Sequence, residues 1–172
     1  GRAEMEMAAK AGANIAVVMA NAPDSTIKEC IEAGKNYGLK ICVDCINTDK
    51  IEERIADIEK WGADYIAVHT AIDDQTYGKT PFDVLRRICS RVKVPIAVAG
   101  GINSENVIDA INAGASIVIV GGYIRKSKNA KAATESMKSA VNEKRRISTT
   151  LFKRVSHEGV REALEKLSTA NI

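Results

Sequence analysis

Short apolar runs alternate along the chain with longer stretches in which apolar residues recur every three or four positions. Five runs rich in Val, Ile and Ala predict strands, over residues 14–19, 39–46, 64–70, 96–99 and 117–120. Between these runs the apolar spacing is helical, as at Ile27, Cys30 and Ile31. Strands that alternate with helices in this way predict an α/β fold with a parallel sheet and right-handed crossovers. The pattern leaves two architectures open, a barrel and an open doubly wound sheet.

The ends of the predicted helices carry their own signals. Glycines that close a helix shortly before a strand stand at Gly12, Gly38, Gly62 and Gly114. The residues predicted to begin helices are Asp24 or Ser25, the pair Asp49 and Glu52, and Thr80 with Pro81. No G-x-G-x-x-G follows the first predicted strand, which disfavours a dinucleotide-binding site.

The stretch from Pro95 to Ile124 organises the rest of the prediction. It reads as strand, glycine pair, helix, strand, glycine pair, with the pairs at Gly100–Gly101 and Gly121–Gly122. Both strands lack charges, as is typical of parallel strands buried on both faces. Glycine after a strand lets backbone N–H groups approach an anion, and barrels often bind phosphate at the loops after their last two strands. Two such turns in succession favour a phosphate site, although either pair alone could serve only as a tight turn.

Charge balance and cysteine content narrow the classes of function. The 172 residues carry 25 basic and 22 acidic side chains, well mixed, for a net charge of +3. This balance does not indicate a nucleic-acid partner, and no apolar run reaches the ~20 residues of a membrane span. Cys30, Cys42, Cys45 and Cys89 lie in apolar segments, which fits a reducing cytoplasm. Because Cys42 and Cys45 are three apart on a predicted strand, they face opposite sides and do not suit a zinc or redox site.

Few polar residues follow the predicted strands, where the chemistry of a barrel is located. Asp44 ends the second strand, His69 ends the third with Asp73 beyond it, and Asn103 follows the first glycine pair. An imidazole has a pKa of about 6.5, so His69 at the mouth of a barrel could move a proton on a sugar carbon or oxygen. A lone histidine is more often structural, but the nearby glycine turns favour catalysis. Asp44 could orient substrate hydroxyls or hydrogen-bond loop N–H groups.

Three motifs make the chain resemble 3-hexulose-6-phosphate synthases, of the orotidine 5′-monophosphate decarboxylase superfamily. They are Asp-Tyr-Ile-Ala-Val-His-Thr-Ala-Ile-Asp-Asp-Gln (64–75), Pro-Ile-Ala-Val-Ala-Gly-Gly-Ile-Asn (95–103) and Ile-Val-Ile-Val-Gly-Gly-Tyr-Ile (117–124). The resemblance covers about residues 1–140. It implies a cytoplasmic, homodimeric lyase that joins formaldehyde to ribulose 5-phosphate, or runs the reverse cleavage, through a Mg²⁺-bound enediolate. His69 would then transfer protons, and Gly100, Gly101, Gly121 and Gly122 would cradle the phosphate.

Related enzymes of the superfamily supply the alternatives. Keto-gulonate-phosphate decarboxylases tend to carry Glu, Arg and Thr where this chain has Asp44, Ile72 and Ala99, which match the synthases. We therefore place Ile72, Asp73 and Ala99 in the substrate pocket. Orotidylate decarboxylases usually carry Gly-Arg at the second phosphate loop, where this chain has Gly-Gly. Decarboxylation of a sugar or nucleotide phosphate, and a non-catalytic scaffold, remain the competing hypotheses.

The resemblance also predicts the domain organisation. Residues 1–142 would form a partial (β/α)8 barrel with five parallel strands, lacking the first three. The family's metal ligands and catalytic lysine lie in a motif Asp-x-Lys-x-x-Asp-Ala-Gly, and Gly1 resembles its closing glycine, so no Mg²⁺ ligand is expected in this chain. Residues 143–156 are predicted to be a linker. Residues 157–172 are predicted to be an amphipathic helix, either capping the barrel or opening a fused domain similar to the ribonuclease E activity regulator A family.

Overall fold

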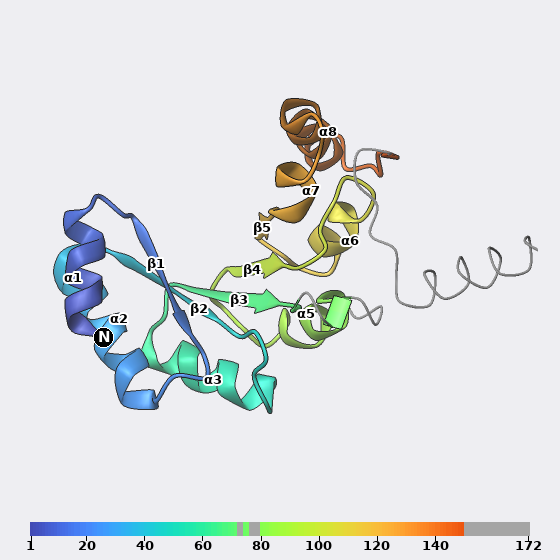
Figure 1. Ribbon diagram of the computed structural model, residues 1–172. Coiled ribbons are helices and arrows are strands. Elements are labelled where there is room, and N and C mark those ends of the chain that lie inside the picture. Colours follow the sequence, from blue (N-terminus) through green and yellow to red (C-terminus); the bar gives the residue numbers. More distant parts are fainter. Residues whose placement is uncertain (72–73, 76–79, 150–172) are drawn as a thin grey trace, which may run out of the picture.

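The computed structural model describes residues 1–71, 74–75 and 80–149, in which helices and strands alternate along the chain (Figure 1). The strands are β1 (Ile15–Met19), β2 (Lys40–Asp44), β3 (Tyr65–His69), β4 (Ile96–Ala99) and β5 (Ile117–Ile119). The helices are α1 (Arg2–Lys10), α2 (Asp24–Tyr37), α3 (Ile51–Trp61), α5 (Phe82–Ile88), α6 (Val107–Asn112), α7 (Gly122–Arg125) and α8 (Ala130–Asn142). None of the helices in the described ranges has the length and apolar character needed to cross a bilayer.

The five strands form one sheet in which each strand pairs in parallel with the next along the chain. The order is β1-β2-β3-β4-β5. The register sets Val17 opposite Cys42, Cys42 opposite Tyr65, His69 opposite Ala99, and Ala99 opposite Ile119. This confirms the predicted parallel sheet of five strands.

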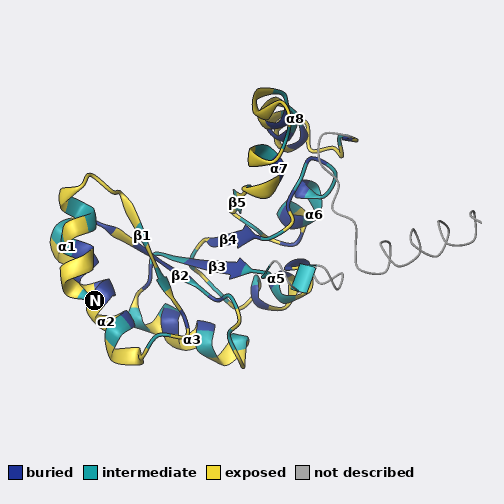
Figure 2. Ribbon diagram, viewed as in Figure 1, coloured by how far each residue is buried: buried dark blue, intermediate teal, exposed yellow. Residues whose placement is uncertain are grey.

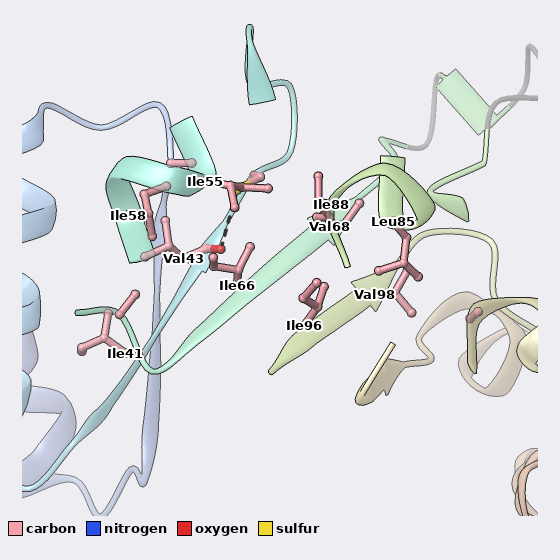
Figure 3. Close-up of a cluster of buried hydrophobic side chains, with 14 of the residues drawn as sticks. Ile41, Val43, Ile55, Ile58, Ile66, Val68, Leu85, Ile88, Ile96 and Val98 are labelled. Carbon is pink, nitrogen blue, oxygen red and sulfur yellow. Dashed lines mark hydrogen bonds between the residues drawn. The ribbon is translucent and has the colours of Figure 1, made fainter. Parts of the chain in front are cut away.

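The two faces of the sheet are covered differently. On one face, alternate strand residues pack against α3 and α5 in the core shown in Figure 3, where Ile41, Val43, Ile66, Val68, Ile96 and Val98 meet Ile55, Ile58, Leu85 and Ile88. Burying one such side chain contributes about 1.5–3 kcal/mol, so this layer holds the described chain together. The other face carries a separate small cluster of Cys42, Ala67 and Ala97 beside Tyr65. Sequential strand order with the core helices on one face is the arrangement of a barrel rather than of a doubly wound sheet.

The face that carries the cluster of Cys42, Ala67 and Ala97, here called the inner face, is exposed at both edge strands of the sheet, β1 and β5. Figure 2 shows β1 and β5 far less buried than β3 and β4. Val17 on β1 is 61% exposed, and Ile119 on β5 is 49% exposed. The prediction that residues 117–120 are buried on both faces was therefore wrong, whereas all four residues of β4 are buried as predicted. The difference arises because β5 has a paired neighbour on one side only among the described residues.

Helix ends follow the glycine signals better than the cap signals. Gly38 and Gly62 end α2 and α3 in the left-handed conformation, with φ of 71° and 93°. The predicted N-terminal caps were wrong: the capping positions are Pro23, Lys50 and Pro81, and no side chain caps there. Two of the three carboxylates predicted at helix starts instead form ion pairs between elements, Asp24 with Arg54 and Glu52 with Arg87.

Candidate functional site

Most of the predicted polar and glycine residues lie together at the carboxyl ends of strands β2 to β5. Asp44 is the last residue of β2, His69 the last of β3 and Ala99 the last of β4. The register gives their side chains the same face, because Asp44 pairs with Ala67 and His69 pairs with Ala99. This is the inner face, which the core helices leave free, so the residues converge where a barrel carries its chemistry.

Asp44 and His69 contact each other directly. His69 Nδ1 lies 3.1 Å from Asp44 Oδ2, and the side chains are 32% and 17% exposed. The other carboxylate oxygen, Oδ1, accepts a hydrogen bond from the backbone N–H of Ile46 at 2.9 Å. Asp44 therefore binds a loop N–H group, one of its two predicted roles, and also orients the imidazole. The sequence placed the two residues at neighbouring strand ends but gave no sign of this contact.

The first glycine pair follows β4 with a backbone that only glycine adopts easily. Gly100 has a φ of +104° and Gly101 a φ of +68°. A Cβ at Gly100 would stand 2.5 Å from the carbonyl oxygen of Thr70, which directly follows β3. Thr70 in turn donates its N–H to the carbonyl of Ala99 at 3.2 Å. The tight-turn interpretation therefore accounts for Gly100, because two backbones cross in contact there.

Gln75 lies against this glycine pair, and sequence reasoning missed it as a functional candidate. Its Nε2 donates to Thr70 O at 2.7 Å, and its Oε1 would lie 3.1 Å from a Cβ at Gly101. Gln75 closes the motif 64–75, six residues after His69, which is the only signal that the sequence offers. The side chain joins the loop after β3 to the loop after β4.

The second glycine pair differs from the first. Gly121 has an ordinary negative φ of −107°, and a Cβ at Gly121 or Gly122 would meet no atom within 4 Å. Neither backbone strain nor packing within the described residues requires glycine here. Open space at the carboxyl end of β5 is consistent with the approach of a ligand, and tight turns alone do not explain this pair.

Two further predictions concern the pocket and the loop behind the first glycine pair. Ala99 is 7% exposed and stands beside His69 in the register. Ile72 and Asp73 lie outside the described residues. Asn103 organises the start of α6: its Oδ1 accepts hydrogen bonds from the N–H groups of Glu105 and Asn106, at 2.9 and 3.2 Å.

The cysteines and the potential metal ligands give a negative result. Cys42 lies in the inner cluster and Cys45 in the helix-facing core, so the two thiols occupy different sides as predicted. Burial raises the pKa of Cys42 to about 11 and that of Cys45 to about 12. Residues 1–71, 74–75 and 80–149 contain no group of three His, Cys, Asp or Glu side chains able to hold a metal ion.

Comparison with known proteins gives a consistent picture. Residues 1–137 match the orotidine 5′-phosphate decarboxylase / HUMPS family. A 3-hexulose-6-phosphate synthase of Staphylococcus epidermidis is 37% identical over 142 residues, which are 82% of this chain and 68% of the relative. A 3-hexulose-6-phosphate synthase of Staphylococcus aureus is 34% identical over the same shares of both chains.

Solved structures agree with the sequence relatives. The crystal structure of 3-hexulose-6-phosphate synthase from Salmonella typhimurium has a TM-score of 0.78 at 35% identity, covering 83% of this chain and 68% of that one. The crystal structure of KGPDC from Streptococcus mutans has a TM-score of 0.71 at 17% identity, over 83% of this chain and 67% of that one. The second likeness concerns the fold alone.

Proposed function

The chain belongs to the orotidine 5′-phosphate decarboxylase / HUMPS family, and we propose that it works as an aldehyde-lyase that joins formaldehyde to ribulose 5-phosphate or cleaves the hexulose 6-phosphate product. Relatives named 3-hexulose-6-phosphate synthase, at 34–37% identity over four fifths of the chain, support this reaction. Asp44, Ala99 and the Gly-Gly at 121–122 support it over decarboxylation, because these residues match the synthase pattern.

The contact between Asp44 and His69 is the observation that carries the proposal. An ionised carboxylate only accepts hydrogen bonds, so Nδ1 of His69 donates to Asp44 and Nε2 of the neutral ring keeps its lone pair. Such a ring can accept a proton from carbon 1 of ribulose 5-phosphate. The electron pair left on carbon 1 forms the new bond to the formaldehyde carbon. The formaldehyde oxygen then takes up the proton, so the imidazole returns to its starting state.

We place the substrate phosphate at the two glycine turns. The turns follow the neighbouring strands β4 and β5, at the same end of the sheet as His69. The crowded Gly100 fixes the shape of the first turn, and the open surroundings of Gly121 and Gly122 leave room for an anion at the second. A phosphate held there would present the sugar carbons toward the inner face, where Asp44, His69 and Ala99 lie.

Mg²⁺ is the cofactor that the family resemblance implies, but the described residues do not form its site. Asp44 and His69 are only two candidate ligands, and octahedral coordination of Mg²⁺ needs more oxygen ligands than they supply. We propose that the metal ligands belong to a part of the protein outside residues 1–71, 74–75 and 80–149. The exposed inner-face residues of β1, such as Val17, support the proposal that further strands pack beside β1. A homodimer, a cytoplasmic location and a fused C-terminal domain remain proposals of the same kind.

Formaldehyde consumption in the presence of ribulose 5-phosphate, measured on the full-length protein, tests the reaction. His69→Ala should lower kcat by about 10²- to 10⁴-fold, the usual contribution of a general acid–base group. Asp44→Asn should also lower kcat, because an amide leaves the ring tautomer undefined.

The matched control is Asp64→Asn. Asp64 also accepts a backbone N–H, from Ile41 at 2.9 Å, and pairs with a cation, but it lies at the opposite end of the sheet. This variant should keep its kcat. A loss below tenfold in His69→Ala would return His69 to a structural role, and release of carbon dioxide in place of formaldehyde turnover would favour the decarboxylase alternative.

A further inference from the structure

A buried pair of hydroxyl groups lies between the two glycine turns. Ser104 stands three residues after Gly101, and Tyr123 directly follows Gly122. Ser104 Oγ and the Tyr123 hydroxyl are 3.1 Å apart, and the two residues are 0% and 2% exposed. A hydrogen bond in a buried setting thus joins the loop after β4 to the helix after β5.

A third segment, residues 145–149, completes this cluster. The backbone N–H of Ile147 donates to Ser104 O at 2.9 Å, and Ser104 Oγ donates to Ile147 O at 2.8 Å. The Tyr123 hydroxyl lies 3.2 Å from Thr149 Oγ1, within hydrogen-bond distance, and Thr149 is 6% exposed. The N–H of Thr149 also donates to Glu105 Oε1 at 2.9 Å. Residues 147–149 therefore run along the loop that follows the first glycine pair, and the three hydroxyls hold each other.

The cluster has a cost that only its hydrogen bonds offset. Burying a hydroxyl group that has no hydrogen-bond partner costs more free energy than a single hydrogen bond contributes to stability. Burial raises the pKa of Tyr123, but hydrogen bonds with Ser104, Thr149 and Ser136 outweigh burial, so its pKa is lowered overall. The Tyr123 oxygen therefore has hydrogen-bond partners on three residues.

We propose that Ser104, Tyr123 and Thr149 are positioning residues that hold the two glycine turns at the spacing that the substrate phosphate requires. The inference rests on the proposed function and deepens it. N–H groups from two loops bind one phosphate only if the loops keep a fixed distance, and the hydroxyl cluster ties these loops together. By this assignment the segment predicted to be a linker contributes to the phosphate site.

Tyr123→Phe in the full-length protein tests the assignment with little change in shape. The variant loses the hydroxyl that contacts Ser104 and Thr149, so KM for ribulose 5-phosphate should rise about fivefold for each hydrogen bond lost, while kcat stays within about twofold. The competitive inhibition constant of inorganic phosphate should rise by the same factor as KM. Thr149→Val loses one of these two contacts and should raise KM about fivefold, whereas Thr149→Ser, which keeps the hydroxyl, should keep the wild-type KM.

Tyr37→Phe is the matched control. Tyr37 also loses a hydroxyl bonded to one partner, Glu6 at 3.0 Å, but it joins α2 to α1 away from the glycine turns. KM should be unchanged there. A Tyr123→Phe variant that melts earlier but keeps its KM would overturn the assignment and leave the proposed function intact. A wild-type protein that does not turn over formaldehyde and ribulose 5-phosphate would refute both.

Discussion

Replacing Gly121 by alanine separates ligand binding from folding at the second glycine turn. A Cβ at Gly121 meets no atom within 4 Å and the φ of −107° suits alanine, so the free energy of unfolding should change by less than about 1 kcal/mol. A phosphate oxygen must come within about 3 Å of an N–H group to bind it, and a methyl in that space prevents the approach. Losing one hydrogen bond to a charged group costs about 1.5–3 kcal/mol, which predicts a rise in KM for ribulose 5-phosphate of roughly 10- to 150-fold.

Two controls make this prediction specific. Gly12→Ala also finds no atom within 4 Å, but its φ is +87° and it lies at the opposite end of the sheet. It should lower the free energy of unfolding by about 1–2 kcal/mol and leave KM unchanged. Gly100→Ala should lose about 2 kcal/mol or more, because its Cβ overlaps Thr70 O. Thermal unfolding and initial-rate kinetics on the same preparations supply both quantities. An unchanged KM in a folded Gly121→Ala protein would refute the phosphate site at this turn.

Two further predictions concern Gln75 and the buried thiols. Gln75→Ala removes the hydrogen bond to Thr70 O and should raise KM about fivefold with kcat preserved. Gln75→Glu places a carboxylate beside Gly101, so it should raise KM more at low salt than at high salt. Equal KM values for both variants and the wild type would show that Gln75 does not belong to the site. Because burial raises the pKa of Cys42 to about 11 and that of Cys45 to about 12, the folded chain keeps protons that the unfolded thiols release above about pH 9. The free energy of unfolding should therefore be fully maintained below about pH 9 and fall as the pH rises toward about 12. Each thiol should contribute a loss of about 1.4 kcal/mol for every pH unit that separates its folded pKa from its unfolded pKa. The free energy of unfolding, measured by urea denaturation, should therefore fall less steeply with pH in Cys42→Ala than in the wild type. The same pH dependence in both proteins would contradict the assignment.

The amino-acid sequence by itself determined the elements and the chemical candidates. Branched apolar runs specify strands, and glycines such as Gly38 and Gly62 end helices, because both signals act through the local backbone. The start of α8 also has a local signal, since Asn129 caps it with its Oδ1 accepting from Ala132 N at 2.9 Å. Asp44 and His69 could be singled out for the same reason, since a polar residue at the end of an apolar run is visible without the fold.

Only the tertiary structure decided which of these residues meet. The contact between Asp44 and His69 depends on the register of β2 against β3, which is set across 25 residues by packing and not by either strand alone. The same holds for Ser104, whose partners lie 19 and 43 residues further along the chain. Tertiary contacts also overrode a local preference where Asp24, predicted as a cap, pairs with Arg54. Local patterns report what each segment can form, whereas the register and the packing of distant segments decide which side chains share one site.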